Sequence, residues 1–315
     1  MCTAISFVGK NHYFGRNLDL DYHYQEQVVV SPRQFPLAGM EQHPAIIGMA
    51  TVVEGYPLYY DGTNEQGLSV AALHFPGNGV YHKAKPGKEA ISSFDFIPYL
   101  LTRCKNSREA WELLQNAVVT EEAFSQSYPP TPLHWLIADR DMAFAAESTA
   151  EGLKLWENPV GVLTNNPPFE SMMGHLSLYR NLSAQEGENR LVPEIDLVPI
   201  SGGSGGYGLP GDFSSPSRFV RAAFALHHKG EVAEISQFFH VLSYVEQLDG
   251  CVQAKGRFHK TVYSSCCDTQ RGIYYYCTYE NRQITAVDMG KTDLCGRELT
   301  AFPLQWSQQI RWETK

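Results

Sequence analysis

A cysteine directly follows the initiator methionine, and it has a chemical option that no other cysteine in the chain has. If Met1 is removed, Cys2 carries a thiol and a free α-amino group on one residue. An α-amine has a reference pKa of about 7.7–8.0 and a thiol one of about 8.5, so proton transfer between them near neutral pH costs little. The amine can later give that proton to a leaving nitrogen, which amide hydrolysis requires. The alternative is that Cys2 is a small buried residue at the start of a strand.

Two charged residues have a spacing that brings them back towards Cys2. Alternating side chains over residues 3–7 and 12–17 predict two strands around a short turn. Such a hairpin carries Arg16 and Asp19 close to the N-terminus. A guanidinium beside a thiol favours the thiolate, and a carboxylate can orient an ammonium. A surface ion pair is the alternative interpretation of these two side chains.

Several short segments together resemble one protein family. These segments are Met1-Cys2-Thr3, Gly15-Arg16-Asn17-Leu18-Asp19, Val30-Ser31-Pro32-Arg33, Thr164-Asn165-Asn166-Pro167, Leu209-Pro210-Gly211-Asp212 and Ser215-Pro216-Ser217-Arg218-Phe219. In them the chain resembles the choloylglycine hydrolases, N-terminal-nucleophile amidases that include bile salt hydrolases and penicillin V acylases. The resemblance is greatest to the bile salt hydrolases of gut bacteria. It implies a four-layer αββα sandwich, hydrolysis of a linear amide through Cys2, a homotetramer, and neither a cofactor nor a metal.

The resemblance also implies roles for Asn165, Arg218 and His74. Asn165 falls where the family supplies a side-chain amide to the oxyanion hole, a suitable donor for a developing oxyanion. Arg218 falls on an active-site arginine near the nucleophile. His74 stands where bile salt hydrolases carry an asparagine and penicillin V acylases often a tyrosine, and its backbone N–H would complete the oxyanion hole.

Each of these three residues also has an ordinary interpretation. Asn165 is a typical turn former, and His74 is a polar side chain with a satisfied hydrogen bond. Arg218 could be a solvated arginine in the first turn of a helix, although a cation there opposes the helix dipole.

An amphipathic acyl group such as a steroid acid needs an apolar groove beside the nucleophile. Candidate residues for this groove are Leu18, Leu20, Tyr24, Tyr59 and Tyr60, although each could equally be ordinary core. Together with the resemblance, they favour glycine- or taurine-conjugated bile salts as the substrate. Penicillin V or another N-acyl amide is the alternative, and the histidine at position 74 bears on that choice. The sequence shows no dense basic cluster that could bind the anionic end of the conjugate, so it does not indicate whether glycine or taurine conjugates are preferred.

Two other functions compete with the amidase. Residues 202–206 match G-x-S-x-G, which would make Ser204 the nucleophile of a serine hydrolase. A nucleophile elbow needs a strand before it and a helix immediately after it, and residues 207–211 cannot start a helix. The other candidate is a non-catalytic protein that binds amphiphiles on the same scaffold.

The pattern of strands and helices predicts an α+β fold built on antiparallel sheets. Strand patterns fill much of residues 3–75, 133–147 and 261–289, and helical patterns cover 93–104, 107–118, 169–180, a segment from 214, and 231–242. Strands that follow one another through short turns pair antiparallel, and helices then collect on the sheets. Because no linker-like segment divides the chain, we expect one domain over residues 1–315.

Composition excludes several classes of protein. The 315 residues are 43% hydrophobic, which is enough for a large core. The net charge of −9 without a run of basic residues argues against nucleic acid as a partner. No membrane span and no secretory signal are visible, so we expect a cytoplasmic protein. The seven scattered cysteines indicate neither a disulfide framework nor a zinc site.

Overall fold

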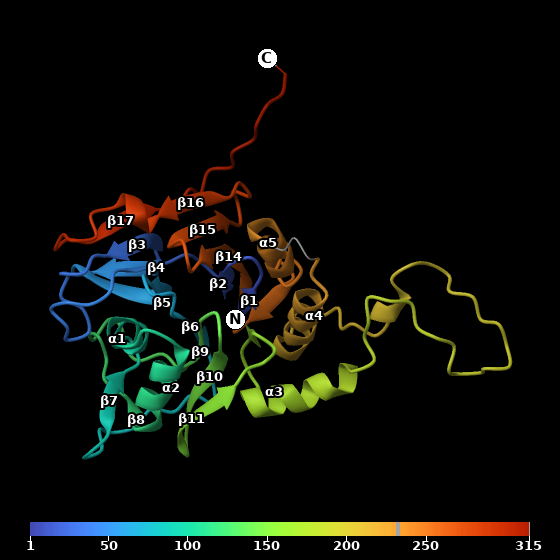
Figure 1. Cartoon of the computed structure of the whole chain (residues 1–315), viewed down its shortest axis with the longest axis horizontal. Helices are drawn as coiled ribbons and strands as arrows, with labels where there is room; N and C mark the ends of the chain where they lie inside the picture. Colours follow the sequence, from blue (N-terminus) through green and yellow to red (C-terminus); the bar gives the residue numbers. More distant parts are fainter. Residues whose placement is uncertain (231–233, 315) are drawn as a thin grey trace.

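The computed structural model describes residues 1–230 and 234–314, and two large antiparallel sheets dominate it (Figure 1). The predicted helix over 231–242 therefore begins outside the described residues, and its described part is α5, Ile235–Ser243.

The first sheet contains the N-terminal hairpin at its centre. Its strands are ordered β12 (Val162–Leu163), β1 (Cys2–Val8), β2 (His12–Leu20), β14 (Arg257–Asp268), β15 (Ile273–Thr278) and β16 (Thr285–Asp288), and β13 (Val252–Ala254) pairs with β14. Gly15 explains part of the sequence pattern in β2. A Cβ at this position would collide with the backbone of Ser265 and Cys266 in β14, so only glycine lets these two strands pair.

The second sheet has eight strands. Their order is β11 (Gly152–Glu157), β10 (Ala143–Thr149), β9 (Leu133–Ala138), β6 (Ser69–His74), β5 (Tyr56–Asn64), β4 (Ile46–Val53), β3 (Gln27–Ser31) and β17 (Thr300–Pro303). Every pairing in it is antiparallel, as predicted. The C-terminal strand β17 was not predicted, and it closes the free edge of β3.

Helices cover the outer face of each sheet. The pair α1 (Phe96–Arg103) and α2 (Ser107–Gln115) lies on the second sheet, whereas α3 (Phe169–Leu176), α4 (Ser215–His227) and α5 lie on the first (Figure 1). Short 3₁₀ segments η1 (Ser177–Tyr179), η2 (Ser204–Gly206) and η3 (Met289–Lys291) complete the elements. The predicted αββα sandwich is confirmed. Among the described residues, no helix is both long and apolar enough to cross a membrane.

One prediction about the helices is wrong at its end. The helix predicted over 107–118 stops at Gln115, and β8 (Ala117–Thr120) follows it and pairs in parallel with β7 (Glu89–Ser92). The β-branched residues Val118 and Val119 favour a strand, but a four-residue strand is too short to produce a clear alternation.

Side-chain alternation assigns each strand face to a layer. In β1, Thr3 contacts α4 and Phe7 packs against Phe238 of α5, so the odd positions face the helices. The even positions Cys2 and Ala4 therefore face the second sheet, and both belong to the apolar core that lies between the sheets and under α4 and α5. A separate core lies between the second sheet and α1 and α2.

Candidate active site

Cys2 is the first residue of β1 and its side chain is 3% exposed. It lies opposite Leu18 in β2, and Ala4 lies opposite Arg16. Cross-strand partners share a face of the sheet, so Arg16 and Cys2 both point towards the second sheet. The hairpin predicted from the sequence thus brings Arg16 to the face that carries the thiol.

Arg16 crosses the gap between the sheets. Its Nη1 donates to the backbone oxygen of Tyr60 at 3.0 Å and to that of Ala72, so it bridges β5 and β6. Burial works to lower the pKa of Arg16, but electrostatic interactions with Cys2, Tyr263 and Asp61 outweigh this effect and raise that pKa. The guanidinium consequently stays charged beside the thiol.

Asp61 is part of this charge balance, although sequence reasoning missed it. Its carboxylate accepts a hydrogen bond from Tyr274 at 2.7 Å and a longer one from Tyr263 at 3.4 Å. Burial raises the pKa of Asp61 to about 6, and the positive charge of Arg16 opposes that rise. These residues come from β5, β14 and β15, so no local sequence pattern connects them.

Arg218 joins three groups around the N-terminus. It is fully buried, and its Nη1 donates to the Cys2 backbone oxygen at 2.6 Å and to Thr3 Oγ1 at 2.5 Å. Its Nη2 donates to Asn165 Oδ1 at 2.7 Å. The structure thus brings Arg218, in the first turn of α4, directly against the start of β1. A solvated surface arginine is excluded.

Asn165 connects the start of β1 to the end of β6. Its Oδ1 accepts the backbone N–H of Cys2 at 2.8 Å, and its Nδ2 donates to the backbone oxygen of His74 at 2.7 Å. Its own backbone N–H donates to Ser215 Oγ at 2.8 Å. An amide nitrogen has two hydrogens, and among the described residues the second one on Nδ2 has no partner.

The backbone of His74 faces Asn165. Phe75 N donates to Pro132 O, so in this antiparallel pair the N–H and C=O of His74 point away from β9. The His74 C=O meets Asn165, and the N–H lies on the same strand edge. Burial, then the positive charges of the chain terminus and Lys255, lower the pKa of the His74 imidazole to about 4. The ring is therefore neutral near pH 7.

Asp19 lies near the end of β2, where it contacts Thr261 and Arg218. Thr261 Oγ1 donates to its Oδ1 at 2.6 Å, and Arg218 Nη1 lies 3.7 Å from its Oδ2. Burial raises the pKa of Asp19 against the opposing charges of Arg218 and the chain terminus. The Met1 ammonium donates to the Asp19 backbone oxygen at 2.6 Å. Within the described residues, Asp19 Oδ2 is buried without a hydrogen-bond partner.

The candidate groove residues are divided between two environments. Leu18, Leu20 and Tyr60 belong to or pack against the core that contains Cys2. Tyr24 is 40% exposed and its ring packs at a tilt against that of Tyr22. Tyr59 faces the opposite side of β5, where it packs in the core under α1 and its hydroxyl lies 2.8 Å from Ser31 Oγ. Its placement in a groove beside Cys2 is thus wrong, because neighbouring residues of a strand face opposite sides.

Ser204 makes none of the contacts of this arrangement. It begins the three-residue segment η2, is exposed, and belongs to the long excursion between α3 and α4 that projects from the body of the molecule (Figure 1). A 3₁₀ turn takes the place of the strand and long helix that a nucleophile elbow requires. The structure gives Ser204 none of the surroundings of a serine nucleophile.

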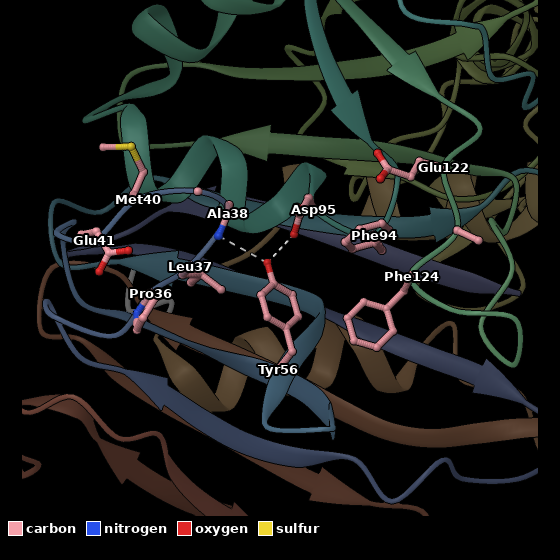
Figure 2. A pocket seen from close by; sticks show the side chains of 12 residues that line it. Pro36, Leu37, Ala38, Met40, Glu41, Tyr56, Phe94, Asp95, Glu122 and Phe124 are labelled. Atoms are coloured by element: carbon pink, nitrogen blue, oxygen red, sulfur yellow. Dashed lines mark hydrogen bonds between the residues drawn. The ribbon is translucent and has the colours of Figure 1, made fainter.

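A concave pocket of about 390 Å³ lies over the start of α1, and it shares no lining residue with the Cys2 cluster (Figure 2). The Tyr56 ring packs on Phe124, and its hydroxyl donates to Asp95 and accepts from the Ala38 backbone N–H (Figure 2). Tyr56, Asp95 and Ala38 are thus engaged with each other on its wall. Across residues 1–230 and 234–314, no group of three or more His, Cys, Asp or Glu side chains is placed to hold a metal ion.

The sandwich, with a cysteine at the start of a central strand, defines the class of N-terminal-nucleophile hydrolases. The fold matches that of penicillin V acylase from Agrobacterium tumefaciens with a TM-score of 0.73 at 18% identity, covering 95% of this chain and 90% of the other. At that identity the likeness concerns the fold alone.

Closer similarities identify the family. The family model described as linear amide C–N hydrolases, choloylglycine hydrolase family, matches residues 2–302. The chain is 45% identical to the bile salt hydrolase/transferase of Lactiplantibacillus plantarum over 98% of both chains. The conjugated bile acid hydrolase of Clostridium perfringens, solved as a cysteine-to-alanine variant, has a TM-score of 0.93 at 33% identity over 100% of each chain. The chain belongs to the choloylglycine hydrolase family and is a hydrolase of linear amides.

Proposed function

We propose that this protein hydrolyses the amide bond of glycine- and taurine-conjugated bile salts through an acyl-thioester on Cys2. The substrate follows the names of the relatives, which act on bile salts or conjugated bile acids. The observation that carries the mechanism is the position of Asn165, which bonds both the Cys2 nitrogen and the His74 carbonyl. It puts a free amide hydrogen beside the thiol-bearing residue.

The reaction begins once Cys2 is the first residue. Its α-amine takes the thiol proton, and the thiolate attacks the substrate carbonyl carbon. The carbonyl electrons move to oxygen, which accepts hydrogen bonds from Asn165 Nδ2 and the His74 backbone N–H. Collapse breaks the C–N bond, and the α-ammonium protonates the leaving amine. Water then attacks the thioester and releases the bile acid, with the Cys2 amine as base.

The charged residues tune this chemistry. Arg16 and Arg218 favour the thiolate because both guanidinium groups are buried close to Cys2. Asp19 orients the amine, and its buried Oδ2 is available as an acceptor. When Met1 is removed, the new ammonium supplies a hydrogen-bond donor for this oxygen, whose nearest cation is Arg218 at 3.7 Å.

Cys2→Ala tests the mechanism. We expect hydrolysis to fall on the order of 10⁶-fold, the cost of losing a nucleophile in a well-studied protease, while the fold is kept. Retained turnover in this variant would exclude the thioester. Ser204→Ala is the matched control, since a serine hydrolase would instead lose activity there and react with a fluorophosphonate.

Penicillin V is the alternative substrate, and the ratio of kcat/KM decides between them. We expect the glycine and taurine conjugates to have higher values than penicillin V. The reverse order would replace the bile salt proposal with an acylase and leave the Cys2 mechanism intact. Binding of bile salts without turnover, measured on protein that begins at Cys2, would favour the non-catalytic alternative.

We also propose that the protein is a cytoplasmic homo-oligomer, with a tetramer as the assembly that the family resemblance implies. The excursion between α3 and α4 carries strongly exposed apolar residues, among them Leu191 at 86% and Val198 at 75%. A second copy that covers them would remove this apolar surface from water. Sedimentation of the intact chain and of Leu191→Ser/Val198→Ser tests the assembly, and a monomer in both would exclude it. Cell fractionation tests the location.

A further inference from the structure

A histidine and a glutamate outside the proposed reaction form a buried pair behind it. His134 in β9 and Glu147 in β10 are fully buried, and His134 Nδ1 lies 3.1 Å from Glu147 Oε1. The same Oε1 accepts the backbone N–H of Phe169 at 3.0 Å. Strand pairing places the two residues directly opposite each other.

The other ring nitrogen of His134 lies near one of the two proposed oxyanion donors, Asn165. His134 Nε2 lies 2.8 Å from the backbone oxygen of Thr164, the residue that immediately precedes Asn165. A carbonyl oxygen can only accept, so Nε2 carries a hydrogen and donates it. Glu147 on the far nitrogen holds the ring in the orientation that makes this bond possible.

The face of the His134 ring lies near the other proposed donor, the backbone N–H of His74. His134 stacks on Phe75 with 4.2 Å between the ring centroids and 4° between the planes. Phe75 immediately follows His74, whose backbone N–H is the second proposed donor. A single imidazole therefore contacts the chain neighbour of each donor.

We propose that the His134–Glu147 pair positions the two oxyanion donors relative to each other. This inference rests on the proposed function. His134 is a positioning residue, since it touches Thr164 and Phe75 and acts on the substrate only through Asn165 and His74. Without His134, both donors and the Cys2 thiol are still present, but the distance between the two donors is no longer fixed. The cost therefore falls on transition-state stabilisation, which depends on donors fixed before the reaction.

The test is His134→Gln in the full-length protein with Cys2 as its first residue. Removing an oxyanion donor outright costs about 10²–10³ in kcat, so we expect misplacement to lower kcat roughly tenfold to a hundredfold, with KM within about twofold. Alkylation of Cys2 by iodoacetamide needs the thiolate but no oxyanion hole. Its rate, measured on the N-terminal peptide, should stay close to wild type.

The matched control is His12→Gln. His12 is equally buried and has two polar partners, Ser6 Oγ at 2.9 Å and Thr269 Oγ1 at 3.0 Å, but it lies at the opposite end of the N-terminal hairpin from Cys2. We expect its kcat to equal the wild-type value even if it loses stability. Equal kcat in the two variants, or a fall in alkylation as large as that in kcat, would overturn the proposal.

Glu147→Gln provides a second variant if His134→Gln does not fold. It keeps an oxygen for the Phe169 N–H and replaces the carboxyl group beside the ring with an amide, so kcat should fall with an unchanged alkylation rate. Wild-type kcat in this variant would overturn the proposal. The proposed function itself fails separately, if the wild-type protein shows no Cys2-dependent release of glycine from its conjugate.

Discussion

Asn165 Oδ1 lies 2.8 Å from the backbone nitrogen of Cys2, a residue 163 positions away in the sequence. While Met1 is attached, that nitrogen is an amide and has no basicity. After Met1 is removed, the same atom is an amine with a lone pair and hydrogens to donate. The bond to Asn165 can thus persist through maturation, and the nitrogen is already held in place.

We predict that the active protein begins at Cys2. An alanine inserted between Met1 and Cys2 leaves Cys2 with an amide nitrogen after methionine removal, so this variant should fold and be inactive. Intact mass and hydrolysis measured on one preparation check this prediction. Full activity in the variant, or in wild-type protein that retains Met1, would contradict it.

Arg218 and Arg221 provide a comparison within one helix. Arg218 donates to Cys2, Thr3 and Asn165, whereas Arg221 donates to the backbone oxygens of Pro210 and Asp212. We predict that Arg218→Gln lowers the free energy of unfolding by about 3–5 kcal/mol, the range for breaking a buried ion pair, and slows Cys2 alkylation. Arg221→Gln should leave the alkylation rate unchanged. Similar alkylation rates in both variants would show that Arg218 does not act on the thiol.

The fold was largely predictable because successive strands follow each other through short turns, which makes them pair antiparallel. The hairpin of β1 and β2 places Arg16 beside Cys2 through local pairing alone. By contrast, Asp61 and Tyr274 belong to strands of different sheets and come together only in the folded protein. His134 and Glu147 lie in strands whose local sequence does not set them apart. Contacts between distant strands leave no periodic signal, so the buried groups behind the site could not be found from the sequence.

Tyr59 shows a second reason why the sequence alone could not place every site residue. Adjacent tyrosines in the sequence looked equivalent, yet the strand β5 sends Tyr60 towards the core that contains Cys2 and Tyr59 towards the core under α1. Only the register of β5 against β4 decides which of the two faces which core, and that register contains an irregularity between Met49 and Ala50. A one-residue offset of this kind cannot be deduced from alternation.

His12 should make stability depend on pH. Burial, opposed by Asp139 and reinforced by Arg140, lowers the pKa of His12 to about 4 from its usual 6.5. Between these pH values the unfolded chain binds the proton and the folded protein does not, so stability rises with pH over this window. The full effect is about 3 kcal/mol. Urea unfolding at pH 4 to 7 should show a shallower rise for His12→Gln, and an identical slope would contradict this assignment.

His74→Asn separates the backbone of this residue from its side chain. The variant keeps the backbone N–H proposed for the oxyanion hole and introduces the side chain that the family resemblance implies. Because the pKa of the imidazole is about 4, the ring is neutral above about pH 5, and we predict coincident kcat–pH profiles for both proteins between pH 5 and 8. The ratio of kcat/KM for bile salts over penicillin V should rise. A proton-transfer role for the imidazole would instead cost about 10²–10⁴ in kcat with an unchanged rate of Cys2 alkylation, and that outcome would move His74 into the chemistry itself.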